Sequence, residues 1–380
     1  MMKRSAQRLE AVLCAWCRVQ PLLVPQGIRL SRKDWLCLLH SARREGVAGL
    51  VYRASGRDPL GMNAPAGARA TLRQTMLAQA AVWLREEAVL GEVLDALASC
   101  RIRPVLLRGL ALVTDLYGDG SLRPQVDHDL LVGPEEMKKA RDALLSIGFR
   151  SSPGGAGPLL RGSSVIDLHS DPYDRERVPS RAMVIHAAAS GVRARAVKRY
   201  VAGREVDFPC PEDRLLLLAA HLVKHAFDRL IRLVDVAECW RAGGFEPREL
   251  VRQAHSEGTA DALFYALAAA RTRLGAEVST QLLERLAPGR RPVVDRAFGR
   301  VLAGRPSPYF GEWLLLAQLP GLRAQMRAAG EMLQPKEIRE RSRSRGSSWG
   351  TLLPLRIARL AARGAIGLVG SLASRPLDRH

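Results

Sequence analysis

The stretch that most constrains this chain is residues 104–132, which read PVLLRGLALVTDLYGDGSLRPQVDHDLLV. A short apolar run there ends at Arg108 and Gly109, which predicts a buried strand that turns into a helix where the backbone can approach a neighbour closely. The closing VDHDLLV predicts a second strand, and since successive side chains of a strand alternate between faces, Asp127 and Asp129 should share a face. Two such carboxylates are tolerated when they are solvated, when one is protonated, or when a divalent cation such as Mg²⁺ lies between them.

A later strand supplies a third acid. Residues 165–169 read VIDLH, and the same alternation places Asp167 and His169 on one face and the apolar residues on the other. Residues 134–148 begin with a proline and two glutamates, which predicts a helix, because acidic side chains favour the positive end of a helix dipole. A glycine-rich loop and one more strand are expected at residues 154–162 and 204–208.

The rest of the chain is patterned as helices. Apolar residues at three- and four-residue spacing flank the region of alternating strands and helices, which together predict an α+β fold with a mixed-sheet core. Ser31 followed by Asp34 is typical of a helix start. The expected parts are an N-terminal helical region at 1–100, an α/β core at 101–210, a C-terminal helical region at 211–330 and a basic tail at 331–380. The flanking helices are expected at residues 5–19, 31–44, 71–99, 261–274 and 280–286, with a loop at 56–67.

One polar seam follows the helix predicted over residues 211–240. Polar residues recur there at steps of three and four, so they would lie on one stripe of an otherwise apolar helix. They are His221, His225, Asp228, Arg232 and Asp235. The seam either faces a cleft and binds substrate or phosphate, or forms an internal network of ion pairs, and we favour the internal network. Zinc binding by the two histidines would need further ligands that the sequence does not identify.

Composition bounds the partners and the surroundings of the protein. The formal net charge of +20 favours anionic partners such as nucleotides, nucleic acid or an acidic membrane surface. The six cysteines lack a framework spacing, Cys14 and Cys17 read as structural, and neither a secretory signal nor a membrane-length apolar run is evident, so we expect a reduced cytoplasmic protein. The tail is basic and serine-rich at residues 336–348. Residues 352–372 would form an amphipathic helix that packs on its own domain, contacts an anionic membrane or binds RNA.

A series of short motifs runs through residues 100–240. In chain order they are Arg108-Gly109, Leu116-Tyr117-Gly118, Leu122-Arg123-Pro124, Asp127-His128-Asp129-Leu130-Leu131-Val132, Asp167-Leu168-His169 and Pro211-Glu212-Asp213, followed by the helix with His221 and His225. The series resembles the uncharacterised nucleotidyltransferase family of the DNA polymerase beta superfamily. That family has a Lys-Gly turn, then a Leu-Tyr, an Arg-Pro and an Asp-x-Asp-Leu-Leu-Val strand. The order of the motifs is far more specific than any one of them.

The resemblance implies a nucleotidyltransferase-like core and a magnesium-dependent reaction. In the superfamily, paired carboxylates hold Mg²⁺ ions that neutralise triphosphate charge, and a third acid readies the attacking hydroxyl. Carried over by position, Asp127 and Asp129 would be catalytic metal ligands, and Asp167 would be the third acid of the same site.

The resemblance also implies phosphate contacts. Arg108 stands where the family has lysine, and Gly109 would let the backbone approach the phosphates. Arg123 would balance the acids or touch a phosphate; the alternative for Arg123 is an ion pair with Asp127 or Asp129.

Three more residues depart from the family pattern, and one of them is Val126, which stands where the family tends to have a small residue. Leu110 replaces the serine of the superfamily's general Gly-Ser signature, and His128 stands where an apolar residue is usual. Alternation points His128 away from the aspartates, so we interpret it as a structural, hydrogen-bonded residue. The leading hypothesis is transfer of a nucleoside monophosphate from a nucleoside triphosphate to a protein, small molecule, sugar or nucleic acid. The alternatives are an inactive nucleotide-binding or scaffolding protein, and an arginine-rich binder of nucleic acid or membrane surfaces.

Overall fold

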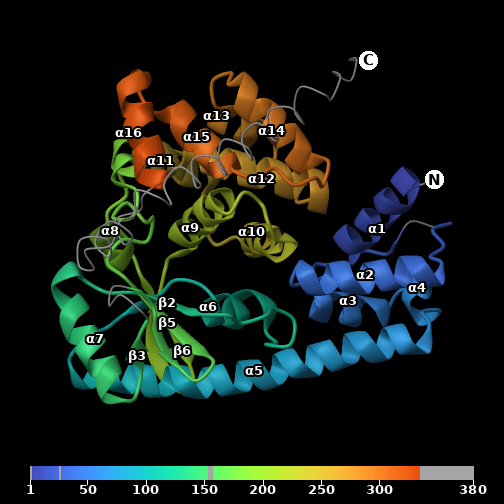
Figure 1. The fold of residues 1–380 in the computed structure, drawn as a ribbon, viewed down its shortest axis with the longest axis horizontal. Coiled ribbons are helices and arrows are strands. Elements are labelled where there is room, and N and C mark those ends of the chain that lie inside the picture. Colours follow the sequence, from blue (N-terminus) through green and yellow to red (C-terminus); the bar gives the residue numbers. More distant parts are fainter. Residues whose placement is uncertain (1, 25–26, 153–156, 334–380) are drawn as a thin grey trace, which may run out of the picture.

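A seven-stranded mixed sheet occupies one end of the molecule, in the order β3-β4-β5-β2-β1-β7-β6 (Figure 1). This computed structural model describes residues 2–24, 27–152 and 157–333. The strands are β1 Val105–Leu106, β2 His128–Leu131, β3 Arg150–Ser151, β4 Leu159–Arg161, β5 Ser164–His169, β6 Val197–Val201 and β7 Arg204–Phe208. Helices flank the sheet, so the predicted α+β class is confirmed.

Strand β2 lies in the middle of the sheet, between β5 and β1. It pairs in parallel with β5, so that Asp129 lies opposite Asp167, and it is antiparallel to β1. All residues of β2 are buried, as expected for a strand that is covered on both faces. The strands predicted at residues 165–169 and 204–208 are confirmed as β5 and β7.

Two details of the strand predictions are wrong. Strand β2 begins at His128, so Val126 is exposed and Asp127 lies directly before the strand. The loop predicted over residues 154–162 ends earlier, because Leu159–Arg161 forms β4 and pairs antiparallel with β5.

The N-terminal helices are α1 Met2–Trp16, α2 Arg32–Arg44, α3 Ala48–Ser55, α4 Pro59–Met62 and α5 Ala66–Ser99. The start predicted for α2 is confirmed, since the Ser31 hydroxyl accepts from the backbone N–H of Asp34 and the Asp34 carboxylate accepts from that of Ser31. The loop predicted at residues 56–67 contains the short helix α4 and the first residues of α5.

Helix α5 is the longest element and runs beneath both halves of the molecule (Figure 1). Its first turns place Leu72 in the core formed with the other N-terminal helices. Its last turns place Leu90 and Leu97 against the sheet, beside Leu130 of β2. Helix α5 therefore links the sheet to the other N-terminal helices.

The remaining helices are α6 Leu110–Leu112, the π-helical turn η1 Val113–Tyr117, the 3-10 turns η2 Pro134–Glu136 and η3 Pro179–Met183, α7 Met137–Ser146, α8 Ala189–Ala194, α9 Pro211–Lys224, α10 Leu230–Ala242, α11 Pro247–Ser256, α12 Ala260–Leu274, α13 Thr280–Leu286, α14 Pro292–Leu302, α15 Phe310–Gln318 and α16 Gly321–Leu333. The helices predicted at residues 261–274 and 280–286 are confirmed as α12 and α13. Helices α1 to α3 share one hydrophobic core with α9, α10 and α12, which includes Trp16, Leu38, Leu222 and Tyr265. The two flanking helical regions therefore pack together, and they form the helical half of the molecule.

The single helix predicted over residues 211–240 is wrong, because α9 and α10 are separate helices. Between them Ala226 and Phe227 have φ angles of 53° and 56°, in the left-handed region. That conformation costs about 1–2 kcal/mol per residue. The ring of Phe227 lies 5.4 Å from that of Phe310 and 6.2 Å from that of Phe298, so packing of this aromatic group offsets the strain.

The histidine between the two aspartates is structural, as predicted. His128 is fully buried, and its Nε2 lies 3.2 Å from a carboxylate oxygen of Glu86 on α5. The other oxygen of Glu86 accepts from the hydroxyl of Ser164 on β5 at 2.9 Å. Glu86 thus ties the acidic strands β2 and β5 to α5.

Replacing Glu86 by alanine should destabilise the protein by about 1–3 kcal/mol, because two buried donors lose their acceptor. The hydrogen bond from His128 is the main cause that lowers the pKa of Glu86 to about 2. The wild-type advantage should therefore be complete above the pKa of an unfolded glutamate, near 4.5, and disappear as the pH falls through 2. Urea unfolding at pH 7 and pH 2.5 measures this. Glu87→Ala, one residue along the same helix, is the control; an equal loss for both variants would contradict the role of Glu86.

Within the described residues, no helix is both long and apolar enough to cross a membrane. The predictions for residues 336–348 and 352–372 of the tail lie outside the described part of the chain.

Candidate active site

The parallel pairing of β2 with β5 brings three polar side chains together. Asp129 lies opposite Asp167 in register, and His169 follows Asp167 two residues along β5. One ligand-capable atom from each of the three residues lies within 4.8 Å of the others. The alternation predicted for Asp167 and His169 is therefore confirmed, and the sheet register adds Asp129 to the group.

Asp129 is held by two partners. The guanidinium of Arg108, from the turn after β1, donates from Nε at 2.9 Å and from Nη2 at 2.8 Å to the two carboxylate oxygens of Asp129. The Nε2 atom of His169 lies 2.9 Å from Asp129 Oδ1 and 3.6 Å from Asp167 Oδ2. The side chains of Arg108 and Asp129 are 12% and 7% exposed, so this is a buried, bidentate ion pair.

Asp127 lies next to this group, at the entry to β2. Its carboxylate makes no hydrogen bond or ion pair with another residue in the described part of the chain. Burial, and secondly the charge of Asp129, raise the pKa of Asp127. The charge of Asp129 therefore acts on Asp127, but Asp127 lies outside the cluster that Asp129, Asp167 and His169 form.

The charges of the cluster are unevenly balanced. Burial by itself raises the pKa of Asp129, but the positive charge of Arg108 and the hydrogen bonds from His169 and Arg108 hold it well below its usual range. Burial raises the pKa of Asp167, and the charge of Asp129 adds to the effect. Asp129 is therefore ionised and satisfied, whereas Asp127 and Asp167 carry charges that the protein compensates poorly.

These residues fit a divalent cation. Carboxylate oxygens are the ligands that Mg²⁺ prefers, and a bound cation would offset the burial and the repulsion that raise the pKa values of Asp127 and Asp167. Asp129 and Asp167 are close enough to share an ion. Arg108 already neutralises Asp129, so the cation and the guanidinium would have to share that carboxylate.

The turn from β1 to α6 depends on Gly109. Its φ is 68° and its ψ is −114°, a conformation that residues with a side chain rarely adopt. A Cβ atom there would lie 2.7 Å from the amide of Gln125 and 3.1 Å from the carbonyl oxygen of Asp127. The glycine therefore lets this turn approach the segment that carries Asp127.

Gly109→Ala should destabilise the protein by about 1–3 kcal/mol, through backbone strain and displacement of the Asp127 backbone. Gly243→Ala is a matched control, because Gly243 has a φ of 66° and a ψ of −138° but a Cβ atom added there would meet nothing within 4 Å. Chemical denaturation should show a larger loss for Gly109→Ala than for Gly243→Ala. Equal losses would mean that the backbone conformation alone, and not the contact with the acidic strand, demands glycine at this turn.

Arg123 forms no ion pair with Asp127 or Asp129 in the described part of the chain, so the alternative interpretation of this residue is wrong. Its guanidinium donates from Nε and Nη2 to Asp235 of α10, both at 2.9 Å, rather than to Asp127 or Asp129. The hydroxyl of Tyr117 also donates to Asp235, at 2.6 Å. Arg123 and Asp235 thereby join the turn before β2 to the helical half, and a phosphate contact by Arg123 stays a prediction.

The polar seam is divided between two places because α9 and α10 are separate. Asp235 belongs to the buried pair with Arg123, whereas His221 accepts at Nε2 from Nε of Arg232 at 3.2 Å. The rings of His221 and His225 lie 4.4 Å apart. Much of the seam is thus an internal network, in keeping with the favoured interpretation, but His221 also borders a cavity.

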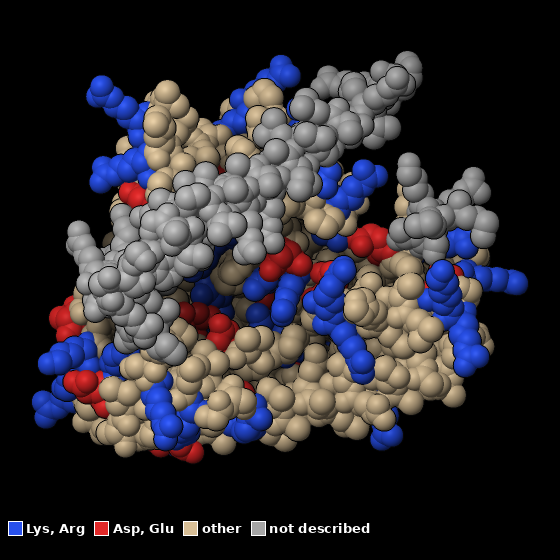
Figure 2. Space-filling view, in the orientation of Figure 1, with Lys and Arg blue, Asp and Glu red and all other residues tan. Residues whose placement is uncertain are grey.

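That cavity opens beside the acidic cluster. It comprises about 670 Å³ of empty space, including its open mouth, and Arg108 contributes to its wall. Figure 2 shows a hollow between the sheet and the helices above it, with acidic and basic side chains on its wall.

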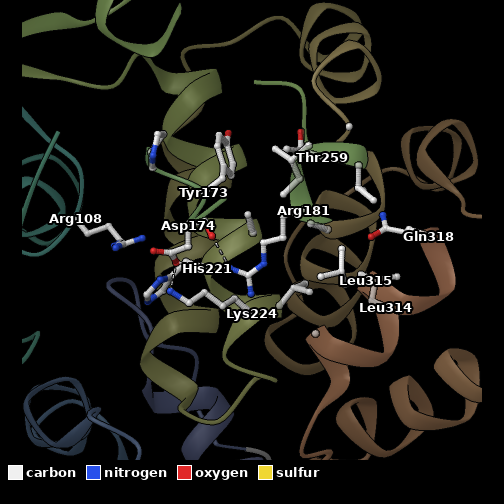
Figure 3. A pocket seen from close by; sticks show the side chains of 18 residues that line it. Arg108, Tyr173, Asp174, Arg181, His221, Lys224, Thr259, Leu314, Leu315 and Gln318 are labelled. Atoms are coloured by element: carbon white, nitrogen blue, oxygen red, sulfur yellow. Dashed lines mark hydrogen bonds and ion pairs between the residues drawn. The ribbon is translucent and has the colours of Figure 1, made fainter. Parts of the chain in front are cut away.

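Figure 3 shows how the wall of the cavity is arranged, with Asp174 between Arg108 and Arg181. His221 and Lys224 come from α9, and Leu314, Leu315 and Gln318 come from α15 on the opposite side. The sequence pointed to Arg108 and His221 but not to Asp174, Arg181 or Lys224. The segment of Asp174 and Arg181 lacks a regular pattern, and their proximity to α9 is a matter of tertiary structure.

The comparisons with known proteins agree with this geometry. A family model described as uncharacterised nucleotidyltransferase matches residues 31–275, which is more than half of the chain. No curated protein and no solved structure matches significantly. The match spans the N-terminal helices from α2, the whole sheet with its acidic cluster, and α9 to α12. The chain therefore belongs to the uncharacterised nucleotidyltransferase family.

Proposed function

We propose that this protein transfers a nucleoside monophosphate from a nucleoside triphosphate to an acceptor, with Mg²⁺ held by Asp127, Asp129 and Asp167. The observation that carries the proposal is the register of β2 and β5, which sets Asp129 opposite Asp167 with ligand atoms within 4.8 Å. Membership of a nucleotidyltransferase family supports a nucleoside triphosphate as the donor. A cytoplasmic location stays a prediction.

The residues of the site have separate roles in this proposal. Bound Mg²⁺ would neutralise the charge of the triphosphate and of the leaving group. Gly109 allows the backbone of its turn to approach the phosphates, and Arg108 adds a positive charge beside them. His169 donates to Asp129 and keeps that carboxylate oriented.

The chemical step is an in-line displacement at the α-phosphorus. The acceptor hydroxyl gives its proton to the carboxylate of Asp167, and its oxygen forms a bond to the α-phosphorus. The bond from that phosphorus to the bridging oxygen of the β-phosphate breaks, and pyrophosphate leaves with the electron pair. Burial raises the pKa of Asp167 in the metal-free protein, and the bound Mg²⁺ would keep this carboxylate ionised and able to accept the proton.

Labelled nucleotides test the proposal. The purified protein is incubated with Mg²⁺, a mixture of candidate acceptors, and nucleoside triphosphate labelled at either the α- or the γ-phosphate. Transfer of the α-label with release of γ-labelled pyrophosphate is expected; transfer of the γ-label would indicate a kinase instead. If Mg²⁺ and nucleotide together neither bind nor raise the melting temperature, the proposal is wrong.

An inactive nucleotide-binding protein is the second candidate. The observation that favours it is the double occupation of Asp129 by Arg108 and His169, which leaves this carboxylate little freedom to bind a metal. Magnesium-dependent nucleotide binding without pyrophosphate release, for every acceptor offered, would select this candidate.

A further inference from the structure

The cavity beside the acidic cluster has a polar end and an apolar end. Arg108, Asp174, Arg181 and Lys224 supply its charged groups, close to the cluster. Val184, Ile185, Leu314, Leu315 and Ala262 supply aliphatic side chains toward α12 and α15. A ligand that matches both ends needs an apolar body and a charged or polar group.

The charges around the cavity do not cancel. Arg108 is matched by Asp129 in the buried bidentate pair. Lys224 is matched by Asp174, whose carboxylate accepts directly from the ammonium group. Arg181 is left with the carbonyl oxygen of Asp174 at 3.5 Å and a carboxylate oxygen of the same residue at 3.9 Å.

Arg181 is therefore a partly buried and poorly paired cation on the wall of the cavity. Its side chain is 19% exposed, and burial lowers its pKa. Among the described residues Glu312 is the next carboxylate that influences it, but the two form no ion pair and burial raises the pKa of Glu312. A guanidinium has five N–H donors, and a buried one is costly unless an acceptor is supplied.

His221 also lines the cavity and adds no charge to its wall. Burial holds its pKa well below the usual value, so the ring is neutral. Its Nε2 accepts from Arg232, and its Nδ1 is buried without a partner among the described residues. The preference of the cavity for an anion therefore depends on Arg181.

We propose that this cavity is the acceptor site, and that the acceptor carries an apolar body and a singly charged anionic group, a carboxylate or a phosphodiester, that binds Arg181. The proposal rests on the proposed nucleotidyl transfer. The anionic group anchors the acceptor, and a separate hydroxyl reacts at Asp167, on the far side of Arg108.

The count of charges distinguishes this ligand from the nucleotide. One unmatched cation suits one negative charge, whereas a triphosphate carries several and would need the metal ions of the acidic cluster. The nucleotide therefore belongs at the Gly109 turn and the acidic cluster, and the cavity remains for the acceptor.

Matched pairs of probes test the anionic preference without any turnover. Binding of 4-phenylbutanoate is compared with that of 4-phenylbutanamide, and binding of methyl phenyl phosphate with that of its neutral triester, dimethyl phenyl phosphate, by titration calorimetry on the full chain. Each anion should bind roughly 10- to 100-fold more tightly than its neutral counterpart, as is typical of a charge-assisted hydrogen bond. The pair with the larger ratio identifies the carboxylate or the phosphodiester as the natural group. If neither anion is preferred, the proposal is wrong.

Two substitutions locate the preference. Arg181→Met removes the charge while keeping much of the length, and should bring both ratios close to one. Arg177→Met is the control, because Arg177 is exposed on the same segment and does not line the cavity. Equal losses in both variants would show a general charge effect and overturn the assignment to Arg181.

Nucleotide binding separates this proposal from the proposed function. The shift in melting temperature caused by Mg²⁺ with a non-hydrolysable nucleotide should be the same in Arg181→Met as in the wild type. A lost shift in Arg181→Met alone would place the nucleotide in the cavity and overturn the acceptor assignment, while transfer at the acidic cluster would stand. A wild type that binds no nucleotide but still prefers the anionic probes would refute the transfer reaction and leave an anion site.

Discussion

Asp167→Asn should lower the rate of nucleotidyl transfer by roughly 10²- to 10⁴-fold, the range expected when a general base is removed. Asparagine keeps the shape of the side chain but accepts no proton and is a poorer metal ligand. The side chain of Asp167 is 41% exposed, and its one ion-pair contact among the described residues is with His169 at 3.6 Å, so the fold should tolerate the change. The measurement is the initial rate of pyrophosphate release at saturating Mg²⁺ and nucleotide.

Stability should change in the opposite direction from activity. Because burial and the charge of Asp129 raise the pKa of Asp167, its ionised form destabilises the folded state above that raised pKa. The asparagine variant lacks this penalty, so its melting temperature at neutral pH without metal should equal or exceed that of the wild type. Asp142→Asn, on the exposed face of α7, is the control and should change neither quantity.

The wild-type rate should fall as the pH falls through the pKa of Asp167, because only the ionised carboxylate accepts a proton. Burial raises that pKa in the metal-free protein, and a bound Mg²⁺ would lower it, so a higher Mg²⁺ concentration should move the acidic limb of the rate profile to lower pH. A variant that keeps more than a tenth of the wild-type rate would exclude Asp167 as the base. A variant that loses both activity and stability would assign it a structural role.

The sequence predicts the identity of the acidic strands, because strand alternation is a local property. Asp127 and Asp129 are two residues apart, as are Asp167 and His169. The alternation of side chains along a strand therefore predicts that Asp167 and His169 lie on the same face of the sheet. What alternation cannot give is the register between β2 and β5, which sets Asp129 against Asp167. The fit of the two strands into one sheet fixes that register.

The sequence does not predict the ion-pair partners of the arginines, because those partners lie far away along the chain. Arg123 lies close in sequence to Asp127, yet it pairs with Asp235 on α10, because the helical half packs against the turn before β2. No glycine or proline marks the break between α9 and α10 in the sequence. Its cause is the pocket for Phe227 beside Phe298 and Phe310, which belong to helices much later in the chain.

Arg108→Met should destabilise the metal-free protein by about 3–5 kcal/mol, because it leaves Asp129 buried without its bidentate partner. The loss should be larger without metal than with it. Asp129 would then face Asp127 and Asp167 with only His169 to offset the negative charge. Mg²⁺ supplies the missing positive charge, so a titration with Mg²⁺ should recover part of the free energy of unfolding.

Arg123→Met is a closely matched control for this experiment. Its pair with Asp235 is also bidentate, and the two side chains are 13% and 2% exposed, against 12% and 7% for Arg108 and Asp129. Both variants should lose similar stability in chelator, but only Arg108→Met should regain it with Mg²⁺. Equal recovery in the two variants would show that Asp129 does not belong to a cation site.

The double variant Arg108→Met with Asp129→Leu completes the cycle. Replacing both members of a buried ion pair by apolar residues is often neutral or stabilising, so the double variant should be more stable than Arg108→Met alone. It should also lack the response to Mg²⁺, since the carboxylate that binds the ion is gone. A double variant that still responds would move the cation to Asp127 and Asp167. Together the three variants show whether Arg108 and Mg²⁺ can each neutralise Asp129. If they can, metal binding and the stability of the sheet both depend on the charge of this one carboxylate.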